Sequence, residues 1–215
     1  MQSVSSVAQR SQPLSWLQPA VLTGSLLPFG WLALSAALGK LGANPIETAL
    51  NQLGLLALIF LWSCLACTPL KILLGWTWPI RLRKTLGLLA FSSALTHFLT
   101  YLALDQGLKL GKVLADVAKR PFIAVGFIAL LLLVPLALTS TKKALQRLGF
   151  KRWKRLHRLI YVVAILATVH FILRVKSHRG EPVVYAAILA VLLLVRIASA
   201  VRDKVRESAR RGRHA

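Results

Sequence analysis

Three histidines inside apolar stretches are the residues of this sequence best suited to chemistry. His97 lies in the apolar run 86–104, and His157 and His170 lie near the two ends of the segment 151–176. An imidazole in the hydrocarbon core of a membrane is costly unless another group pairs with it, so each histidine is a functional candidate. Two imidazoles on opposite faces of a porphyrin are also what a six-coordinate haem iron requires.

The elements that must position these histidines are predicted to be membrane-spanning helices. Hydrophobic residues make up 56% of the chain, and the mean hydropathy is +0.65. A run of about 20 apolar residues is long enough to cross a bilayer as a helix. The sequence therefore predicts an all-α, polytopic membrane helix bundle. Its six transmembrane helices are expected at about residues 21–38, 53–73, 85–104, 121–138, 156–173 and 183–200.

The domain organisation follows from these spans. Residues 19–201 are predicted to form one six-helix transmembrane domain, between an N-terminal tail at 1–18 and a short, frayed basic tail at 202–215. No small-residue cleavage site follows a short apolar region near the N-terminus, so we expect no cleaved signal peptide. Residues 107–120 are expected to form a short amphipathic helix on the outer surface.

The charge distribution predicts the orientation of the bundle. The formal net charge is +22, but the basic residues lie between apolar runs and not on a soluble domain. This pattern favours contact with phospholipid over nucleic acid. The tails and the connections after the second and fourth spans lie on one side of the membrane. They hold more than twice as many Lys and Arg residues as the connections on the opposite side. The positive-inside rule therefore predicts that both termini are cytoplasmic.

Depth in the membrane separates the three histidines. Counted from the cytoplasmic ends of their spans, His97 and His170 lie at similar depth toward the outer leaflet, where they can face each other. If one helix is continuous from His157 to His170, the two lie roughly 20 Å apart and about 140° apart around it. His157 is then either a ligand of a second haem or a boundary histidine that contacts lipid headgroups. For His97 and His170 the alternative is a polar contact between helices.

Small residues precede His97 on its helix. Gly87, Ala90, Ser93 and Ala94 recur at helical spacing. They allow a flat macrocycle to approach the helix, or they allow a second helix to pack closely.

A group of cationic and aromatic residues is expected at the cytoplasmic end of the bundle. Arg81, Arg83, Arg155 and Trp78 could contact a haem propionate, a flavin phosphate or a quinone head, because arginine forms paired hydrogen bonds with such anions. The alternative is that they serve only orientation and the membrane interface. The CxxC pair Cys64 and Cys67 is interpreted as buried small apolar residues.

Long stretches of the chain resemble a known family. Residues 68–102, 119–141 and 148–176 are similar to MsrQ, the haem-binding membrane subunit of bacterial MsrPQ systems, within the ferric-reductase-like transmembrane group. The resemblance implies that His97 in LTHFLTY, His157 in RLHRLIY and His170 in TVHFILR bind haem iron. Many relatives carry a further histidine where this chain has Asn51. The wider group usually has four ligands, so how a second haem would be held stays open.

The resemblance also implies a function and its partners. It implies one or two b-type haems, bound FMN and a multi-pass location in the bacterial inner membrane. Electrons would come from a quinol or a separate flavin reductase and pass to MsrP, a periplasmic molybdoenzyme that repairs methionine sulfoxide in proteins. No catalytic residue is then expected in this chain. The alternatives are a stand-alone ferric or cupric reductase and a small proton-coupled transporter that uses the histidines as relay groups.

Overall fold

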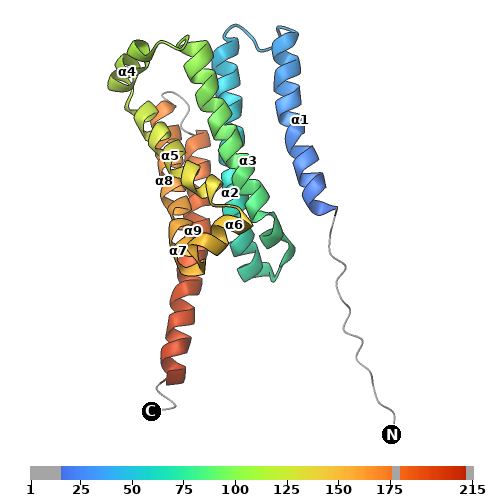
Figure 1. Ribbon diagram of the computed structural model, residues 1–215, viewed down its shortest axis with the longest axis vertical. Coiled ribbons are helices and arrows are strands. Elements are labelled where there is room, and N and C mark those ends of the chain that lie inside the picture. Colours follow the sequence, from blue (N-terminus) through green and yellow to red (C-terminus); the bar gives the residue numbers. More distant parts are fainter. Residues whose placement is uncertain (1–15, 176–179, 212–215) are drawn as a thin grey trace.

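The computed structural model describes residues 16–175 and 180–211, and all regular elements in these ranges are helical. Six helical spans are long and apolar enough to cross a membrane, as predicted. Figure 1 shows the elements. They are α1 (Leu17–Ala37), α2 (Pro45–Leu74), α3 (Trp78–Thr100), the π-helical turn η1 (Tyr101–Asp105), α4 (Leu110–Lys119), α5 (Pro121–Leu138), α6 (Lys142–Leu148), α7 (Phe150–Leu156), α8 (Leu159–Arg174) and α9 (Gly180–Arg211).

The outer surface of the bundle is apolar over most of its length. Leu27 on α1, Leu131 on α5 and Leu194 on α9 all have more than half of their surface exposed. A contiguous apolar surface of this extent marks contact with something other than water. Together with the span lengths, it identifies a multi-pass membrane protein.

Two helices begin earlier than the sequence predicts. α2 begins at Pro45 rather than near residue 53, and α3 begins at Trp78 rather than near residue 85. The Asn44 side chain accepts a hydrogen bond from the Glu47 backbone N–H, and a proline lies in the first turn of both helices. Both features favour a helix start ahead of the long apolar run, which is all that hydropathy detects.

The expectation of one continuous helix from His157 to His170 is wrong. His157 is the C-cap of α7, and α8 begins only at Leu159. At the junction of α7 and α8, the Arg158 N–H donates to the Arg155 carbonyl and the Tyr161 N–H donates to the Arg158 carbonyl. These bonds span three residues instead of the four of an α-helix, so the turn is tighter. The predicted angle of about 140° between the two histidines therefore does not apply.

The C-terminal part of the chain also differs from the prediction. α9 continues to Arg211, so residues 202–211 of the predicted frayed tail are helical. The remainder of that tail, and residues 1–15 of the predicted N-terminal tail, lie outside the described residues. The short amphipathic helix predicted within 107–120 is present as α4.

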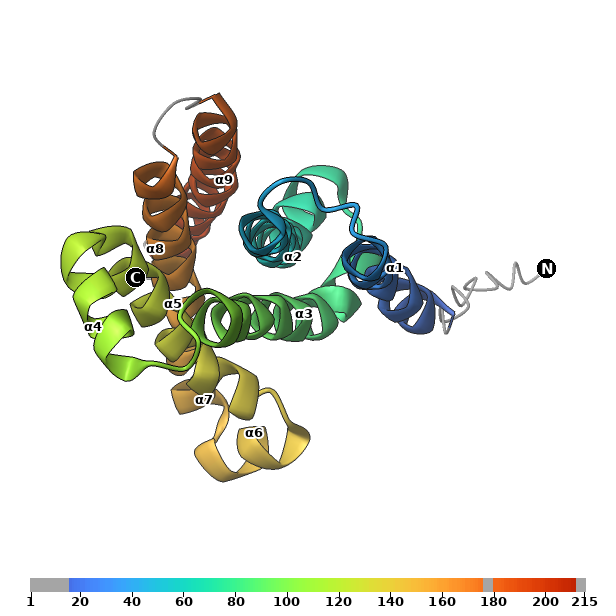
Figure 2. The same ribbon diagram turned by 90° about the horizontal axis from the view of Figure 1, so that it is seen from above.

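The central helices are α2, α3, α5 and α8, with α9 packed on α2 and α8 (Figure 2). Leu58 and Leu65 of α2 meet Val163 and Ala164 of α8 in the main buried cluster. In Figure 1 the start of α1 and the end of α9 lie at the same end of the bundle. The connections from α1 to α2 and from η1 to α5 lie at the opposite end.

Candidate functional site

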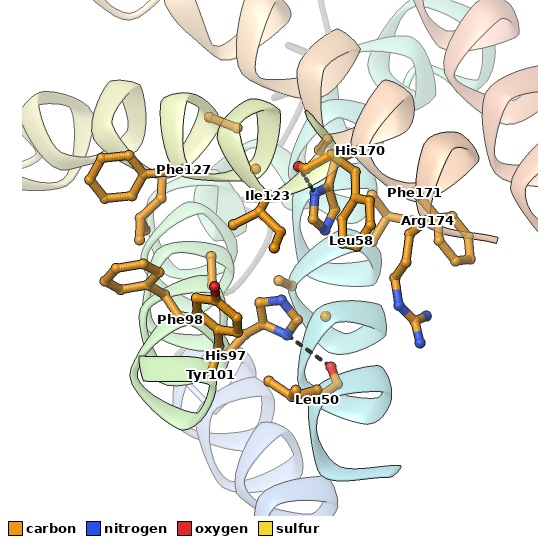
Figure 3. Close-up of a pocket in the computed structure, with 18 of the residues that line it drawn as sticks. Leu50, Leu58, His97, Phe98, Tyr101, Ile123, Phe127, His170, Phe171 and Arg174 are labelled. Carbon is orange, nitrogen blue, oxygen red and sulfur yellow. Dashed lines mark hydrogen bonds between the residues drawn. The ribbon is translucent and has the colours of Figure 1, made fainter. Parts of the chain in front are cut away.

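A cavity of about 450 Å³ lies among α2, α3, α5 and α8. His97 of α3 and His170 of α8 both line it, and Figure 3 shows their rings pointing toward one another. The ring centroids are 6.3 Å apart, and the ring planes are inclined at 89°. The prediction that these two histidines meet is therefore confirmed.

A backbone carbonyl fixes the orientation of each ring. The Nδ1 of His97 lies 2.8 Å from the Leu50 carbonyl oxygen, and the Nδ1 of His170 lies 2.7 Å from the Phe122 carbonyl oxygen. A carbonyl oxygen can only accept a hydrogen bond, so each Nδ1 must be the donor. In a neutral imidazole, Nε2 then keeps its lone pair, which is the form that binds a metal ion.

Glycines make these two contacts possible. Gly54 lies one turn after Leu50 on α2, and Gly126 lies one turn after Phe122 on α5. A Cβ atom on Gly126 would lie 2.6 Å from the Nδ1 of His170, and a Cβ atom on Gly54 would lie 3.3 Å from the Nδ1 of His97. The missing side chains therefore leave the space in which each imidazole reaches its carbonyl.

The small residues on α3 are divided between the cavity and a contact with a neighbouring helix. Ala90 and Ala94 line the cavity, beside His97. Gly87 instead faces α2, since a Cβ atom there would lie 3.7 Å from the Cys64 sulfur, and Ser93 is fully buried. One side of this face therefore forms the cavity wall and the other packs against a neighbouring helix.

The separation of the two imidazoles is that expected for two ligands of one metal ion. With metal–nitrogen bonds of about 2.0 Å, two imidazoles on opposite sides of one metal ion have centroids roughly 6 Å apart. The separation of 6.3 Å agrees with that value. The walls between the helices are apolar, with Phe98, Leu130 and Leu133 among the lining residues. The chemistry of the donors and of the walls therefore fits haem.

The polar residues of the cavity lie near the ends of its helices. Arg174 comes one turn after His170, and its guanidinium lies 3.7 Å from the Glu47 carboxylate. Arg120, at the start of α5, forms an ion pair with Asp116 of α4. Both arginines line the cavity, and sequence reasoning did not single out either for a site role. The one feature of the sequence that indicates a site role for Arg174 is its position one helical turn after His170.

His157 lies apart from this cavity and has different partners. Its Nε2 lies 3.0 Å from the Thr139 hydroxyl, and its ring stacks on Trp153 with centroids 4.0 Å apart. The Thr139 hydroxyl donates its one hydrogen to the Pro135 carbonyl, so it accepts from His157. In this arrangement Nε2 carries the proton, unlike in the other two histidines.

The remaining predicted site residues are at the surface of the described bundle. Arg81, Arg83, Arg155 and Trp78 are all exposed, and none of them is among the residues that line the cavity. Trp78 stacks on Trp76, with ring centroids 6.0 Å apart. Their proposed contacts with a propionate, a flavin or a quinone stay predictions. Cys64 and Cys67 are buried and free, as predicted.

Known proteins are similar to this chain over most of its length. Residues 48–168 match the family described as ferric reductase like transmembrane component. The chain is 48% identical to the protein-methionine-sulfoxide reductase heme-binding subunit MsrQ of Deinococcus radiodurans, over 91% of this chain and 96% of that protein. It is 49% identical to the protein of the same name from Rhodospirillum rubrum, over 86% and 89% of the two chains. It is 48% identical to the protein of the same name from Brucella ovis, over 87% of this chain and 84% of that protein.

Proposed function

This chain belongs to the MsrQ family of haem-binding subunits, within the ferric-reductase-like transmembrane proteins, and we propose that it carries electrons through the membrane. The electrons come from the quinone pool and go to a periplasmic molybdoenzyme, MsrP, which repairs methionine sulfoxide in proteins. The observation that carries the proposal is the pair of imidazoles, His97 and His170, whose free nitrogens face one cavity.

His97 and His170 are the residues that would bind the iron of a b-type haem. Each donates its Nδ1–H to a backbone carbonyl, which holds the ring in place and leaves Nε2 directed at the cavity. When bound, haem supplies a reversible one-electron ferric/ferrous couple. The apolar walls exclude water from this couple, and the surrounding helices hold the two rings at a fixed separation.

Arg174 is the proposed partner of the haem carboxylates. It lines the same cavity as His170 and lies on the same face of α8. Its ion pair with Glu47 is long, at 3.7 Å, so an incoming carboxylate can compete for the guanidinium. Arg120 is held by Asp116 through two nitrogens and is less available.

The proposal extends to a second site at the other end of the bundle. His157 is the proposed ligand there, and its Nε2 can bind iron only if the hydrogen bond to Thr139 breaks. Arg81, Arg83, Arg155 and Trp78 are the proposed contacts for a propionate, a quinone head or FMN at that end. These residues are exposed on the surface of the bundle, so a donor dissolved in the bilayer can reach them.

Spectroscopy of the purified protein tests the ligand pair. We expect dithionite-reduced protein to show b-type bands, and we expect the variants His97→Ala and His170→Ala to lose the haem of this cavity. His157→Ala is the matched variant outside the cavity, and it should leave that haem in place. Unchanged haem content in both His97→Ala and His170→Ala would refute the assignment.

The second candidate function is a stand-alone ferric or cupric reductase, which the match to the ferric-reductase-like family favours. Membranes that contain the chain alone would then reduce ferric citrate at the expense of added quinol. Under the primary proposal, repair of oxidised methionine requires the periplasmic partner as well. Measuring both reactions, with and without that partner, separates the two functions.

A further inference from the structure

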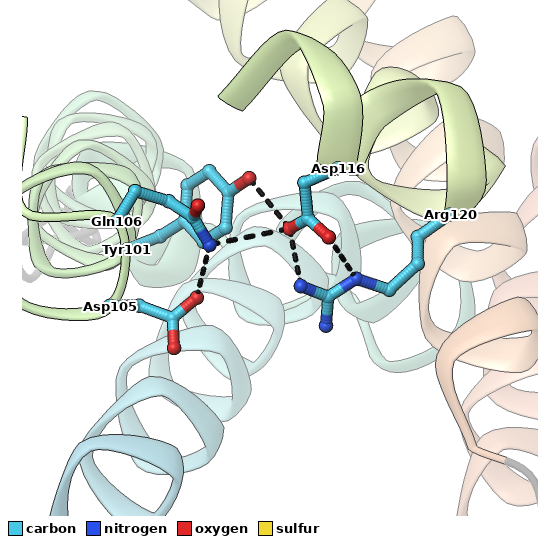
Figure 4. Close-up of polar contacts among 5 residues, drawn as sticks. All are labelled: Tyr101, Asp105, Gln106, Asp116 and Arg120. Carbon is cyan, nitrogen blue, oxygen red and sulfur yellow. Dashed lines mark hydrogen bonds and ion pairs between the residues drawn. The ribbon is translucent and has the colours of Figure 1, made fainter. Parts of the chain in front are cut away.

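Asp116 of α4 is the centre of a polar cluster at the end of the histidine cavity (Figure 4). Its carboxylate accepts hydrogen bonds from the Tyr101 hydroxyl at 2.9 Å and from the Gln106 amide at 3.4 Å. It also accepts from Arg120, through Nε at 2.6 Å and through a second guanidinium nitrogen. The Asp116 side chain is only 14% exposed, so these partners replace most of its contact with solvent.

Two partners of Asp116 lie next to the helix that carries His97 and next to the carbonyl that orients His170. Tyr101 lies one turn after His97, at the start of the π-helical turn η1. Arg120 is the N-cap of α5, and it stands two residues before Phe122, whose carbonyl accepts the Nδ1–H of His170. One carboxylate therefore joins the end of the His97 helix to the start of α5, two residues before the carbonyl that orients the His170 ring.

A purely local role would not account for this arrangement. An ion pair between Asp116 and Arg120 at i,i+4 spacing needs no contact with Tyr101 or Gln106. Tyr101 is 9% exposed and Gln106 is 8% exposed, so their polar groups need partners inside the protein. The π-helical turn, which places Tyr101 in the cluster, is a rare element that occurs frequently at functional sites.

We propose that Asp116 is a positioning residue that fixes the relative placement of the His97 and His170 imidazoles through Tyr101 and Arg120. This inference rests on the proposed function, because its effect is read on a haem held by those two rings. Loss of the carboxylate leaves the buried Tyr101 hydroxyl and the Arg120 guanidinium without their shared acceptor. The two segments are then free to shift relative to each other, and the angle between the rings changes.

The test compares Asp116→Ala with Asp105→Asn in the purified, haem-containing protein. Asp105 lies in the same cluster and accepts a bond from Gln106, but it is bonded to neither Tyr101 nor Arg120. Its substitution therefore removes the same charge without cutting the link. The readouts are haem per protein and the electron paramagnetic resonance spectrum of the ferric form. That spectrum reports the angle between axial imidazole planes, and nearly perpendicular planes give a strongly anisotropic low-spin signal.

We expect Asp116→Ala to lose about tenfold in haem retention, at the lower end of the range for substitutions behind a metal ligand, because Asp116 acts on the two histidines through other residues. Its low-spin signal should become less anisotropic, whereas Asp105→Asn should keep the signal of the unmodified protein. An unchanged signal and haem content in Asp116→Ala overturn this inference alone. A haem-free unmodified protein overturns the proposed function as well.

Tyr101→Phe gives a second, milder test if Asp116→Ala does not fold. It removes one hydroxyl from the link and keeps the ring that packs near Phe98. A smaller change of the signal in the same direction supports the positioning role. A signal identical to that of the unmodified protein overturns it.

Discussion

At the level of single residues, the same arrangement of histidine, carbonyl and glycine occurs twice in the site. In each case a histidine donates to a carbonyl, and the residue one turn after that carbonyl is a glycine. Leu50 and Gly54 supply this arrangement on α2, and Phe122 and Gly126 supply it on α5. The glycines therefore contribute to the orientation of the rings together with the carbonyls.

Gly126→Ala should damage the site more than Gly54→Ala. The added Cβ atom would lie 2.6 Å from Nδ1 of His170, which is closer than real contacts allow, whereas the equivalent contact at Gly54 is 3.3 Å. We expect about a tenfold loss of haem affinity in Gly126→Ala and a smaller loss in Gly54→Ala. Haem titration of the purified variants measures both.

Gly30→Ala on α1 is the control for this pair. A Cβ atom at Gly30 meets nothing within 4 Å, so this variant should bind haem as the unmodified protein does. Equal affinity in all three variants would show that the glycines are not needed for the orientation of the rings.

At the scale of elements, α9 is held to the bundle by polar contacts inside the apolar region. The Arg196 guanidinium donates to the Tyr161 hydroxyl at 2.8 Å and to the Leu65 carbonyl at 2.6 Å. Trp62 of α2 donates to the Tyr185 carbonyl at 3.0 Å. In lipid there is no hydrophobic driving force for helices to associate, so association depends on packing and on interhelical hydrogen bonds. The three bonds therefore help to fix how α9 packs on α2 and α8.

Arg196→Met should lower the stability of the bundle. The substitution removes two hydrogen bonds from a charged donor and leaves the Tyr161 hydroxyl without this partner. We expect the free energy of unfolding to fall by about 1 to 3 kcal/mol. Thermal unfolding in detergent measures the change. Arg206→Met, at an exposed position of the same helix, is the control, and an equal effect there would contradict the role of these bonds.

At the scale of the whole molecule, the helix arrangement and the charge distribution combine in one prediction. The end of the bundle that carries the start of α1 and the end of α9 also carries the α6–α7 segment, which is rich in lysine and arginine (Figure 1). The positive-inside rule assigns this end to the cytoplasm. The histidine cavity and α4 then lie toward the periplasm, where the proposed partner is.

Thiol labelling of intact spheroplasts tests this orientation. A membrane-impermeant maleimide should label Lys112→Cys on α4 but not Ser208→Cys near the end of α9. Both variants should react after the membrane is permeabilised. The unmodified chain provides the background, because Cys64 and Cys67 are buried. Labelling of Ser208→Cys alone in intact spheroplasts would reverse the assignment.

Most of the membrane architecture could be predicted from the sequence. The six spans and the shared depth of His97 and His170 depend on where apolar runs begin and end, which is a local property of the chain. Hydropathy does not detect the helix starts at Pro45 and Trp78, because polar or charged residues within the first two turns, such as Glu47 and Arg81, interrupt the apolar run. The break at His157 was missed because nothing in the residue types there forbids a continuous helix.

The class of protein, the spans and the two histidines that meet follow from the order of the residues. Which atoms hold those rings follows from the packing of the helices, because the partners are backbone carbonyls, and a carbonyl is present at every residue. Packing also selects the cations that line the cavity, since Arg120 and Arg174 do so while Arg81, Arg83 and Arg155 do not. That choice depends on how each helix is rotated against its neighbours, which is a consequence of packing among distant segments.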